Sequence, residues 1–223
     1  MSRSSPLRRV ESPAELATAV REIAERAGAP PTKRALILVG GADFTEPELL
    51  ATLRGFISNL ASACERLGIA VVDGGTDSGV MRLMGEAHAA IGATFPLVGV
   101  APAGALDERS AAGHPIDPAM DHTAVLLTPG ERFGTEMEWL FAAADQLGAD
   151  APTIVLNGGR LSMEEATLRL ERGHTVVAVE GSGRAADALA VDAFTGVRAN
   201  LRAIPVGVGA EDLERLLEEA TRA

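Results

Sequence analysis

The fold of this chain is decided by the stretch Ala70-Val-Val-Asp-Gly-Gly-Thr-Asp-Ser-Gly-Val-Met-Arg-Leu-Met-Gly-Glu86. A short β-branched run at 69–72 is typical of a buried strand. The run breaks at Asp73-Gly74-Gly75, which is a turn signal. Ser78 is a good helix N-cap, and the apolar residues after it recur at the spacing of one helix face. The stretch therefore predicts a strand, a glycine turn and a helix.

That arrangement has a chemical use. Glycines let the backbone approach a ligand, and the first amide groups of a helix have no partner within the helix. These donors, together with the positive end of the helix dipole, attract phosphate or carboxylate. A tight connection with no ligand explains one such loop equally well, so the remaining loops decide between the two interpretations.

Composition predicts one soluble α/β domain. The chain has 223 residues, of which 47% are hydrophobic and only 3% aromatic, so a core of Ala, Val, Leu and Ile is expected. The apolar runs are too short to cross a membrane. Cys64 is the single cysteine, so an intrachain disulfide and a cysteine metal cluster are both excluded. These features favour the cytoplasm, and residues 1–11 are interpreted as a flexible tail.

The charge balance excludes nucleic acid as a partner. The formal net charge is −11, and no basic stripe is visible in the sequence. Acidity does not exclude a small anionic ligand, because backbone amides bind phosphate locally. The scattered histidines have no ligand spacing, so no metal site is expected.

Strands and helices alternate along the whole chain. Strands are expected at 35–39, 69–72, 95–100, 122–127, 153–156, 174–179 and 201–206, and helices at 12–27, 45–68, 135–147, 185–194 and 211–222, with two more starting at Ser78 and Ser162. This alternation predicts an open Rossmann-like parallel sheet of about seven strands with helices on both faces. A single domain results, with an N-terminal helix at 12–28 and a core at 35–190. Residues 105–121 show no period and are either a binding loop or a surface excursion.

In an open parallel sheet, every loop from a strand to a helix lies at the same edge. Nearly all of these loops carry glycine, which favours a phosphate-bearing ligand over plain turns. The expected binding residues are Gly40, Gly41, Gly74, Gly75, Thr76, Ser78, Gly79, Pro129, Gly130, Arg132, Gly134, Thr135, Glu136, Gly181, Ser182, Gly183 and Arg184, and a further glycine pair is Gly158-Gly159. A reversal of strand order between the strands at 35–39 and 122–127 is expected to place the crevice between Gly41 and Gly130.

Three side chains in these loops have more than one interpretation. Glu136 is a stabilised acid near a helix start, an acceptor for ribose hydroxyls, or a general acid or base. Arg184 at a helix N-terminus indicates an anionic ligand, unless it pairs with Asp187 one turn away. Arg132 is a second candidate for phosphate. His122, at the start of a predicted strand, is interpreted as structural.

Four runs of sequence resemble the SLOG superfamily, which joins the LOG cytokinin-activating phosphoribohydrolases, the DprA/Smf proteins and the cytosolic N-terminal region of TRPM channels. They are Gly74–Gly85, Val98–Pro102, Thr128–Glu136 and Glu180–Asp187. The last run and the Asp121-His122 pair are most similar to the TRPM-like branch, LSDAT, in its prokaryotic form. The resemblance covers about residues 35–190.

The resemblance implies a Rossmann-like domain, often a homo-oligomer, that binds a nucleotide or a derivative such as ADP-ribose, NAD or a nucleoside monophosphate. LOG members hydrolyse the bond between base and ribose 5′-monophosphate with the motif Pro-Gly-Gly-x-Gly-Thr-x-x-Glu after an Arg-Lys pair. Here Pro129 to Thr135 are similar at longer spacing, the LOG acid corresponds to Glu138 and the TRPM-like acid to Glu136. No Arg-Lys pair precedes the motif in this sequence, and the preceding loop offers only Arg109. Ligand sensing without turnover or other cofactor is therefore expected, with LOG-like hydrolysis through Glu136 or Glu138 as the alternative and a scaffold role as a third.

Overall fold

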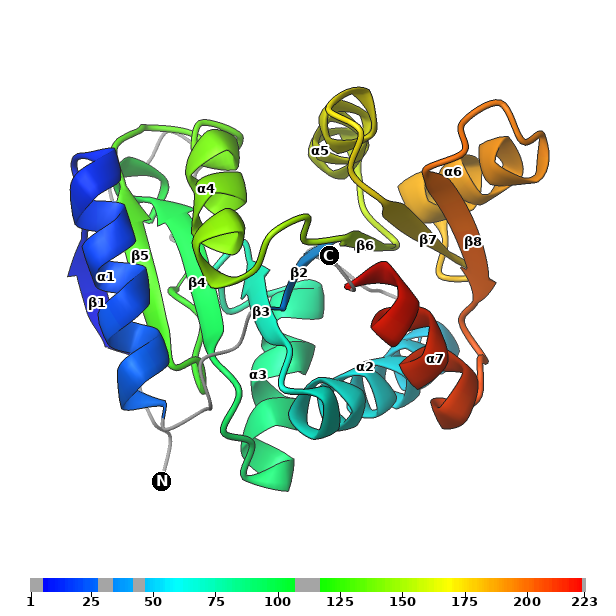
Figure 1. Cartoon of the computed structure of the whole chain (residues 1–223), viewed down its shortest axis with the longest axis horizontal. Helices are drawn as coiled ribbons and strands as arrows, with labels where there is room; N and C mark the ends of the chain where they lie inside the picture. Colours follow the sequence, from blue (N-terminus) through cyan, green and yellow to red (C-terminus); the bar gives the residue numbers. More distant parts are fainter. Residues whose placement is uncertain (1–5, 28–33, 42–46, 107–116, 222–223) are drawn as a thin grey trace.

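A computed structural model describes residues 6–27, 34–41, 47–106 and 117–221. Within them, eight strands form one open, all-parallel sheet in the order β1-β5-β4-β3-β2-β6-β7-β8 (Figure 1). The strands are β1 (Leu7–Arg9), β2 (Ala35–Gly40), β3 (Ala70–Asp73), β4 (Leu97–Pro102), β5 (Ala124–Thr128), β6 (Thr153–Leu156), β7 (Val176–Glu180) and β8 (Leu201–Pro205). The predicted open α/β sheet is confirmed.

Seven α-helices connect these strands within the same residues. They are α1 (Pro13–Arg26), α2 (Pro47–Leu67), α3 (Gly79–Ile91), α4 (Met137–Leu147), α5 (Arg160–Glu171), α6 (Arg184–Phe194) and α7 (Ala210–Ala220). A 3₁₀ turn, η1 (Ala103–Ala105), follows β4. Within the described ranges, no helix has the length and apolarity that a membrane span requires. The predicted helix start at Thr45 lies outside the described residues.

Helices cover both faces of the sheet. On one face, α2, α3 and α7 pack over Leu36, Leu38 and Val71. On the other face, α1 and α4 cover Ile37 and Val39, and α5 and α6 cover the β6–β8 half (Figure 1). Successive side chains of a strand point to opposite faces, so a strand that is covered on both sides must be apolar throughout. Coverage of both faces therefore explains why the strands of this sequence are apolar along nearly their whole length.

The prediction of a flexible tail at 1–11 is wrong for Leu7–Arg9. These residues form β1, which pairs with β5 at the edge of the sheet. Just beyond the strand, the Val10 amide donates to the carbonyl of Leu127 at 2.9 Å, and the Val10 side chain is fully buried. A three-residue edge strand with an exposed Leu7 has no periodic pattern, so the backbone pairing that holds it is invisible in the sequence. The edge strand also raises the strand number from about seven to eight.

The predicted point of strand-order reversal is also wrong. β3, β4 and β5 follow β2 in order on one side, whereas β6 pairs with the other side of β2. The order therefore reverses between β2 and β6, and β5 lies three strands away from β2. Each crossover adds a strand to one side of the sheet or the other, and the period of the hydrophobic residues carries no information about which side. The crevice therefore lies beside Gly41 and Gly159, not between Gly41 and Gly130.

Candidate functional site

A cavity of about 380 Å³ lies at the carboxyl edge of the sheet, at this reversal point. Its lining comes from the end of β2, the loop after β3, the segment entering α4, and the first turns of α5 and α6. The lining residues are Leu38, Val39, Gly40, Gly41, Gly74, Thr76, Ser78, Met81, Phe133, Glu136, Leu140, Gly159, Arg160, Leu161, Ser162, Glu165 and Arg184. Ligands of open α/β sheets bind at such reversal points, so this cavity is the candidate site.

Two glycines let the backbone close the wall at β2. A β-carbon on Gly41 would lie 2.6 Å from Oδ1 of Asn157, and one on Gly40 would lie 2.6 Å from the side chain of Val80. Only glycine fits where the loop after β2 touches both the loop after β6 and helix α3. The Gly41 carbonyl accepts from the Val80 amide at 3.2 Å, which occupies one of the first donors of α3.

Asn157 and Ser182 tie the loops after β6 and β7 together. The Asn157 amide donates to Oγ of Ser182 at 2.8 Å, and Nδ2 of Asn157 donates to the Ser182 carbonyl at 2.7 Å. Asn157 adopts φ of 60°, which asparagine tolerates better than most residues. The Ala186 amide of α6 donates to the Asn157 carbonyl at 2.9 Å. The first amides of α6 are therefore used within the protein, contrary to the idea that every helix start offers free donors.

Helix α5, in contrast to α6, offers free donors at its start. Across the described part of the chain, the first three amides of α5, at Arg160–Ser162, have no hydrogen-bond acceptor, as is usual for a helix start. Arg184 faces the same end of the cavity, since a β-carbon on Gly159 would lie 3.2 Å from Nη2 of Arg184. A guanidinium and three amides thus converge at one end of the cavity, where they are suited to an anion.

The predicted alternative partner of Arg184 is occupied elsewhere. Oδ1 of Asp187 accepts a hydrogen bond from the Gly181 amide at 2.7 Å. Among the described residues, Arg184 forms no ion pair. Its φ of 54° is unfavourable for an arginine and is one of the strained conformations that cluster at binding sites. Pairing with Asp187 therefore does not explain the cation at the start of α6.

Two carboxyl groups face the cavity. Glu136 is 6% exposed, and its Oε2 accepts from the Gly134 amide at 2.6 Å. Burial raises the pKa of Glu136 above its ordinary value, despite hydrogen bonds from backbone amides. Burial, together with the nearby charge of Glu136, raises the pKa of the partly buried Glu165 to about 8. The pair therefore holds one proton near neutral pH.

Glu165 and Ser162 were not among the predicted binding residues. The predicted helix start at Ser162 rests on the run Ser162 to Glu165, which has the Ser-x-x-Glu pattern of a capping box, but α5 begins at Arg160 with Gly159 as its N-cap. The capping-box prediction is therefore wrong, and both residues lie inside the helix, three positions apart on one face. With Gly159 taken as the N-cap in place of Ser162, the sequence would have placed both residues in the first turns of this helix, near the cavity. No sequence pattern marks the apolar lining residues or Phe133 as part of the site.

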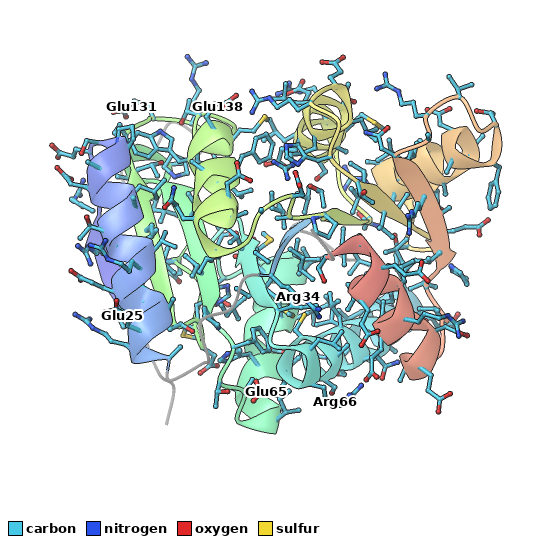
Figure 2. All side chains as sticks on the ribbon, in the orientation of Figure 1. Glu25, Arg34, Glu65, Arg66, Glu131 and Glu138 are labelled. Carbon is cyan, nitrogen blue, oxygen red and sulfur yellow. The ribbon has the colours of Figure 1, made fainter. Side chains whose placement is uncertain are left out.

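The structure brings together only some of the predicted residues. Gly40, Gly41, Gly74, Thr76, Ser78, Glu136 and Arg184 line the cavity, whereas Gly75, Gly79, Pro129, Gly130, Arg132, Gly134, Thr135, Gly181, Ser182 and Gly183 do not. Pro129 instead lines a separate cavity of about 350 Å³ with Arg9 and Thr128. Glu138, labelled on α4 in Figure 2, pairs with Arg172 at the surface at 2.5 Å. Arg109 lies outside the described residues.

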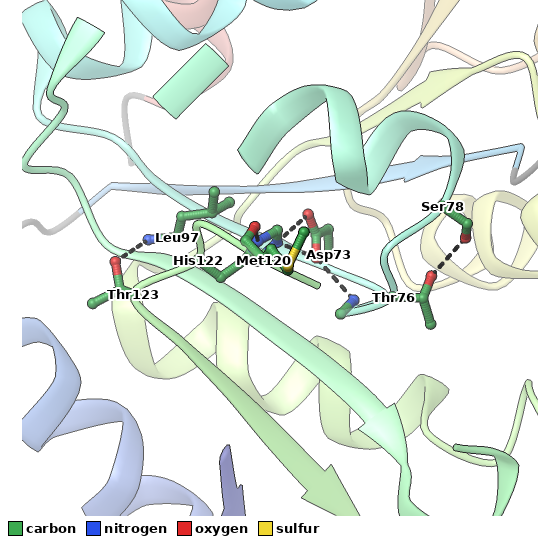
Figure 3. A network of polar contacts seen from close by, with 8 residues as sticks. Asp73, Thr76, Ser78, Leu97, Met120, His122 and Thr123 are labelled. Atoms are coloured by element: carbon green, nitrogen blue, oxygen red, sulfur yellow. Dashed lines mark hydrogen bonds and ion pairs between the residues drawn. The ribbon is translucent and has the colours of Figure 1, made fainter. Parts of the chain in front are cut away.

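A buried ion pair supports the wall formed by the loop after β3. Nε2 of His122 lies 3.0 Å from Oδ2 of Asp73, and Oδ1 of Asp73 accepts from the Gly75 amide at 2.9 Å (Figure 3). Burial lowers the pKa of His122, but the charge and hydrogen bonds of Asp73 and the Met120 carbonyl raise it on balance. The predicted strand start at His122 is wrong, because β5 begins at Ala124 and His122 lies just before it.

The segment before His122 pairs with the same loop. The Ala119 amide donates to the Gly75 carbonyl and the Asp77 amide to the Asp117 carbonyl, each at 2.8 Å. Thr76 and Pro118 form an isolated antiparallel bridge. The His122 and Asp73 pair therefore anchors residues 117–119 against the loop that carries Thr76 and Ser78 into the cavity.

A family model described as "SLOG in TRPM, prokaryote" matches residues 33–216, which include every lining residue of the cavity. None of the curated proteins matches the chain. Similar solved structures include TM1055, a structural genomics target, at 20% identity and a TM-score of 0.61, covering 83% of this chain and 99% of that one. The molybdenum cofactor binding protein of Rippkaea orientalis matches at 14% identity and a TM-score of 0.60, covering 84% and 96%. At these identities, the two structures show the shared fold.

Proposed function

This chain belongs to the prokaryotic branch of the SLOG family related to TRPM, and we propose that its cavity binds a nucleotide-derived ligand. The ligand class comprises ADP-ribose, NAD and nucleoside monophosphates. One observation carries the proposal: Arg184 meets the first amides of α5, which have no acceptor among the described residues, at one end of the cavity at the reversal point of the sheet. In a chain with a formal net charge of −11, that local cluster of donors favours an anionic group such as phosphate.

The rest of the cavity suits the remainder of such a ligand. Leu38, Met81 and Leu140 give the cavity an apolar wall, and Phe133 adds an aromatic ring. Ligand pockets typically combine an apolar lining with a few convergent polar groups, and a nucleobase has apolar faces. The Rippkaea orientalis protein, which shares this fold, is described as binding the molybdenum cofactor. That description supports ligand binding by this fold in general.

Thermal unfolding with AMP, ADP-ribose and NAD tests the proposal. A ligand that binds only the folded state at 100 times its Kd stabilises it by about 2.7 kcal/mol. Arg184→Ala is expected to weaken binding by about 1.5–3 kcal/mol with little effect on the unligated protein, because a charge-assisted hydrogen bond to phosphate is lost. Arg132→Ala is the matched control, since Arg132 lies outside the cavity.

The two arginine variants make the test decisive. Equal loss of affinity in Arg184→Ala and Arg132→Ala would contradict the assignment of the phosphate to the α5 end. If none of the three nucleotides stabilises the protein, the result would contradict the proposed function and would favour a scaffold role. A homo-oligomer is also expected, and light scattering after size exclusion measures its mass.

Hydrolysis of the bond between base and ribose is the second candidate, and the cavity-facing carboxyl of Glu136 favours it. A buried carboxylate next to the sugar stabilises the positive charge that develops on an oxocarbenium-like ribose while water attacks. Glu138 is a weaker candidate than Glu136, because its carboxylate pairs with Arg172 outside the cavity.

Release of free base from AMP, followed by chromatography, tests this second candidate. Glu136→Gln is expected to abolish release, and Glu138→Gln is the matched control. Release that survives Glu136→Gln but not Glu138→Gln would exclude the role assigned to Glu136. No release from wild-type protein that binds AMP would identify the chain as a sensor without turnover.

A further inference from the structure

Helix α5 presents two polar side chains to the cavity that have no partner in the described part of the chain. Ser162 is 5% exposed, and its hydroxyl makes no hydrogen bond among the described residues. Glu165, three residues later on the same face, forms no ion pair within the described chain. Ser162 and Glu165 both line the cavity, so the polar groups of these two side chains are open to a polar group of a ligand there.

Glu136 faces the same space from the segment before α4. Its carboxylate is held by the Gly134 amide and remains able to accept further hydrogen bonds. Because burial and the charge of Glu136 raise the pKa of Glu165 to about 8, Glu165 keeps its proton near neutral pH and can donate. Ser162, Glu165 and Glu136 together therefore offer donors and acceptors with a single negative charge.

This mixture of donors and acceptors fits hydroxyl groups better than a metal ion. Across the described residues, no group of three or more His, Cys, Asp and Glu side chains is arranged to hold a metal. Each sugar hydroxyl both donates and accepts one or more hydrogen bonds, so two neighbouring hydroxyls match a protonated and an ionised carboxyl. Neither the apolar wall nor the arginine end of the cavity provides that combination.

The spacing along α5 connects this group with the anion end. Glu165 lies four residues beyond Leu161, so its position is about 6 Å along the helix axis from the amides at the helix start. A pentose 5-phosphate separates its ring hydroxyls from its phosphorus atom by a comparable distance. A phosphate at the start of α5 therefore brings the pentose ring, and not the base, opposite Ser162 and Glu165.

We propose that Ser162, Glu165 and Glu136 form a subsite for the ring hydroxyls of a pentose whose 5-phosphate lies at the start of α5. The inference rests on the proposed function and specifies it: the ligand is a ribonucleotide or ribose phosphate, and the deoxy counterpart binds more weakly. Ser162 and Glu165 are the specificity-determining residues, and they act on the sugar, not on the phosphate.

Calorimetry with AMP and 2′,3′-dideoxy-AMP tests the subsite, because only the first carries ring hydroxyls. Wild-type protein is expected to bind AMP on the order of tenfold more tightly or better, which corresponds to one or two lost hydrogen bonds. Ser162→Ala and Glu165→Ala are expected to reduce that ratio towards one while leaving affinity for dideoxy-AMP unchanged. Glu164→Ala is the matched control, since Glu164 is exposed and pairs with Arg160 outside the subsite.

A pH series separates the role of Glu165 from simple packing. Between pH 7 and 9, wild-type affinity for AMP is expected to fall as Glu165 loses its proton. Glu165→Gln keeps the size and a donor but does not titrate, so its affinity is expected to stay level. The other charged groups near this carboxyl are Glu136, Glu164, Arg160 and Arg184, and all remain in the variant.

Results that contradict the subsite differ from results that contradict the proposed function. Equal binding of AMP and dideoxy-AMP by the wild type, an unchanged ratio in Glu165→Ala, or the same fall with pH in Glu165→Gln would overturn the subsite. Binding of ADP-ribose without binding of AMP would overturn the subsite and leave the proposed function intact. Absence of binding by AMP, ADP-ribose and NAD would overturn both. If Ser162→Ala fails to fold, the two Glu165 variants alone decide.

Discussion

The side chains of His122 and Asp73 form an ion pair that is fully buried, with Nε2 of His122 3.0 Å from Oδ2 of Asp73. Removing one partner leaves a polar or charged group buried without compensation, which typically costs about 3–5 kcal/mol. Asp73→Asn and His122→Ala are therefore expected to lower the free energy of unfolding in urea by about that amount. Arg54→Ala is the matched control, because the exposed pair of Arg54 with Glu86 is worth less than about 1 kcal/mol. Losses of equal size in all three variants would contradict the special role of the buried pair.

The same pair makes stability depend on pH. The pKa of His122 is raised in the folded chain, so its contribution is complete below the unfolded pKa of about 6.5 and is lost as the pH rises through the raised value. Unfolding free energies of wild type and His122→Gln, measured from pH 6 to 9, are expected to converge as the pH increases. A constant difference over that range would mean that the charge of His122 contributes nothing.

Glu165 is expected to destabilise the folded protein in alkaline solution. Its raised pKa means that the folded chain keeps a proton that the unfolded chain releases above about pH 4.5, so stability falls until the pH passes about 8. Glu165→Gln removes this loss and is expected to be more stable than wild type at pH 9, with a smaller difference at pH 5. Chemical denaturation at the two pH values measures the effect, and Glu164→Gln, at an exposed position, is expected to show a smaller one, because the charge of Glu164 is only the least of the causes that raise the pKa of Glu165.

Asn157 and Ser182 hold the two loops that position α5 and α6. Asn157→Ala removes the side-chain bonds to the Ser182 carbonyl and to the Gly158 amide, for which we expect a loss of about 2–3 kcal/mol. Ser182→Ala removes the bond to the Asn157 amide. A double-mutant cycle in urea is expected to show coupling, because both residues belong to one network. Strictly additive losses would contradict a shared network.

Two glycine-to-alanine substitutions are expected to change stability in opposite directions, one through close backbone contact and the other through helix propensity. Gly41→Ala places a β-carbon 2.6 Å from Oδ1 of Asn157, so the loop after β2 must shift, and we expect lower stability and weaker AMP binding. Gly55 lies inside α2 with nothing within 4 Å of a β-carbon, so Gly55→Ala is expected to stabilise the protein by about 0.5–1 kcal/mol. Thermal unfolding compares the two, and destabilisation of the protein by Gly55→Ala would contradict the argument.

Local pattern was sufficient for most of the secondary structure. The apolar runs at 35–39, 69–72 and 153–156 correspond to β2, β3 and β6 within one residue at each end. The helix predicted at 12–27 is α1, with Ser12 as its N-cap and Pro13 at its first position. These elements could be predicted because strand and helix period, caps and glycine turns are written in neighbouring residues.

The content of the cavity could be predicted only in part. Gly41, Glu136 and Arg184 were expected at the edge of the sheet and do line the cavity. Gly130 and Gly183 occupy loops at the same edge but pack against Thr135 and Asn157 instead. Glycine is required both where a ligand approaches and where two loops touch, and the sequence does not distinguish these uses.

The sequence by itself determined that strands alternate with helices, that the sheet is parallel, and that glycine loops gather at one edge, because each of these follows from patterns a few residues long. Only the tertiary structure decided that the strand order reverses between β2 and β6, that β1 joins the edge, and that Ser162 and Glu165 face Glu136. The physical reason is that these relations depend on which side of the sheet each crossover takes and where each helix begins in space. Such choices are made by packing between residues far apart in the chain, so no local pattern records them.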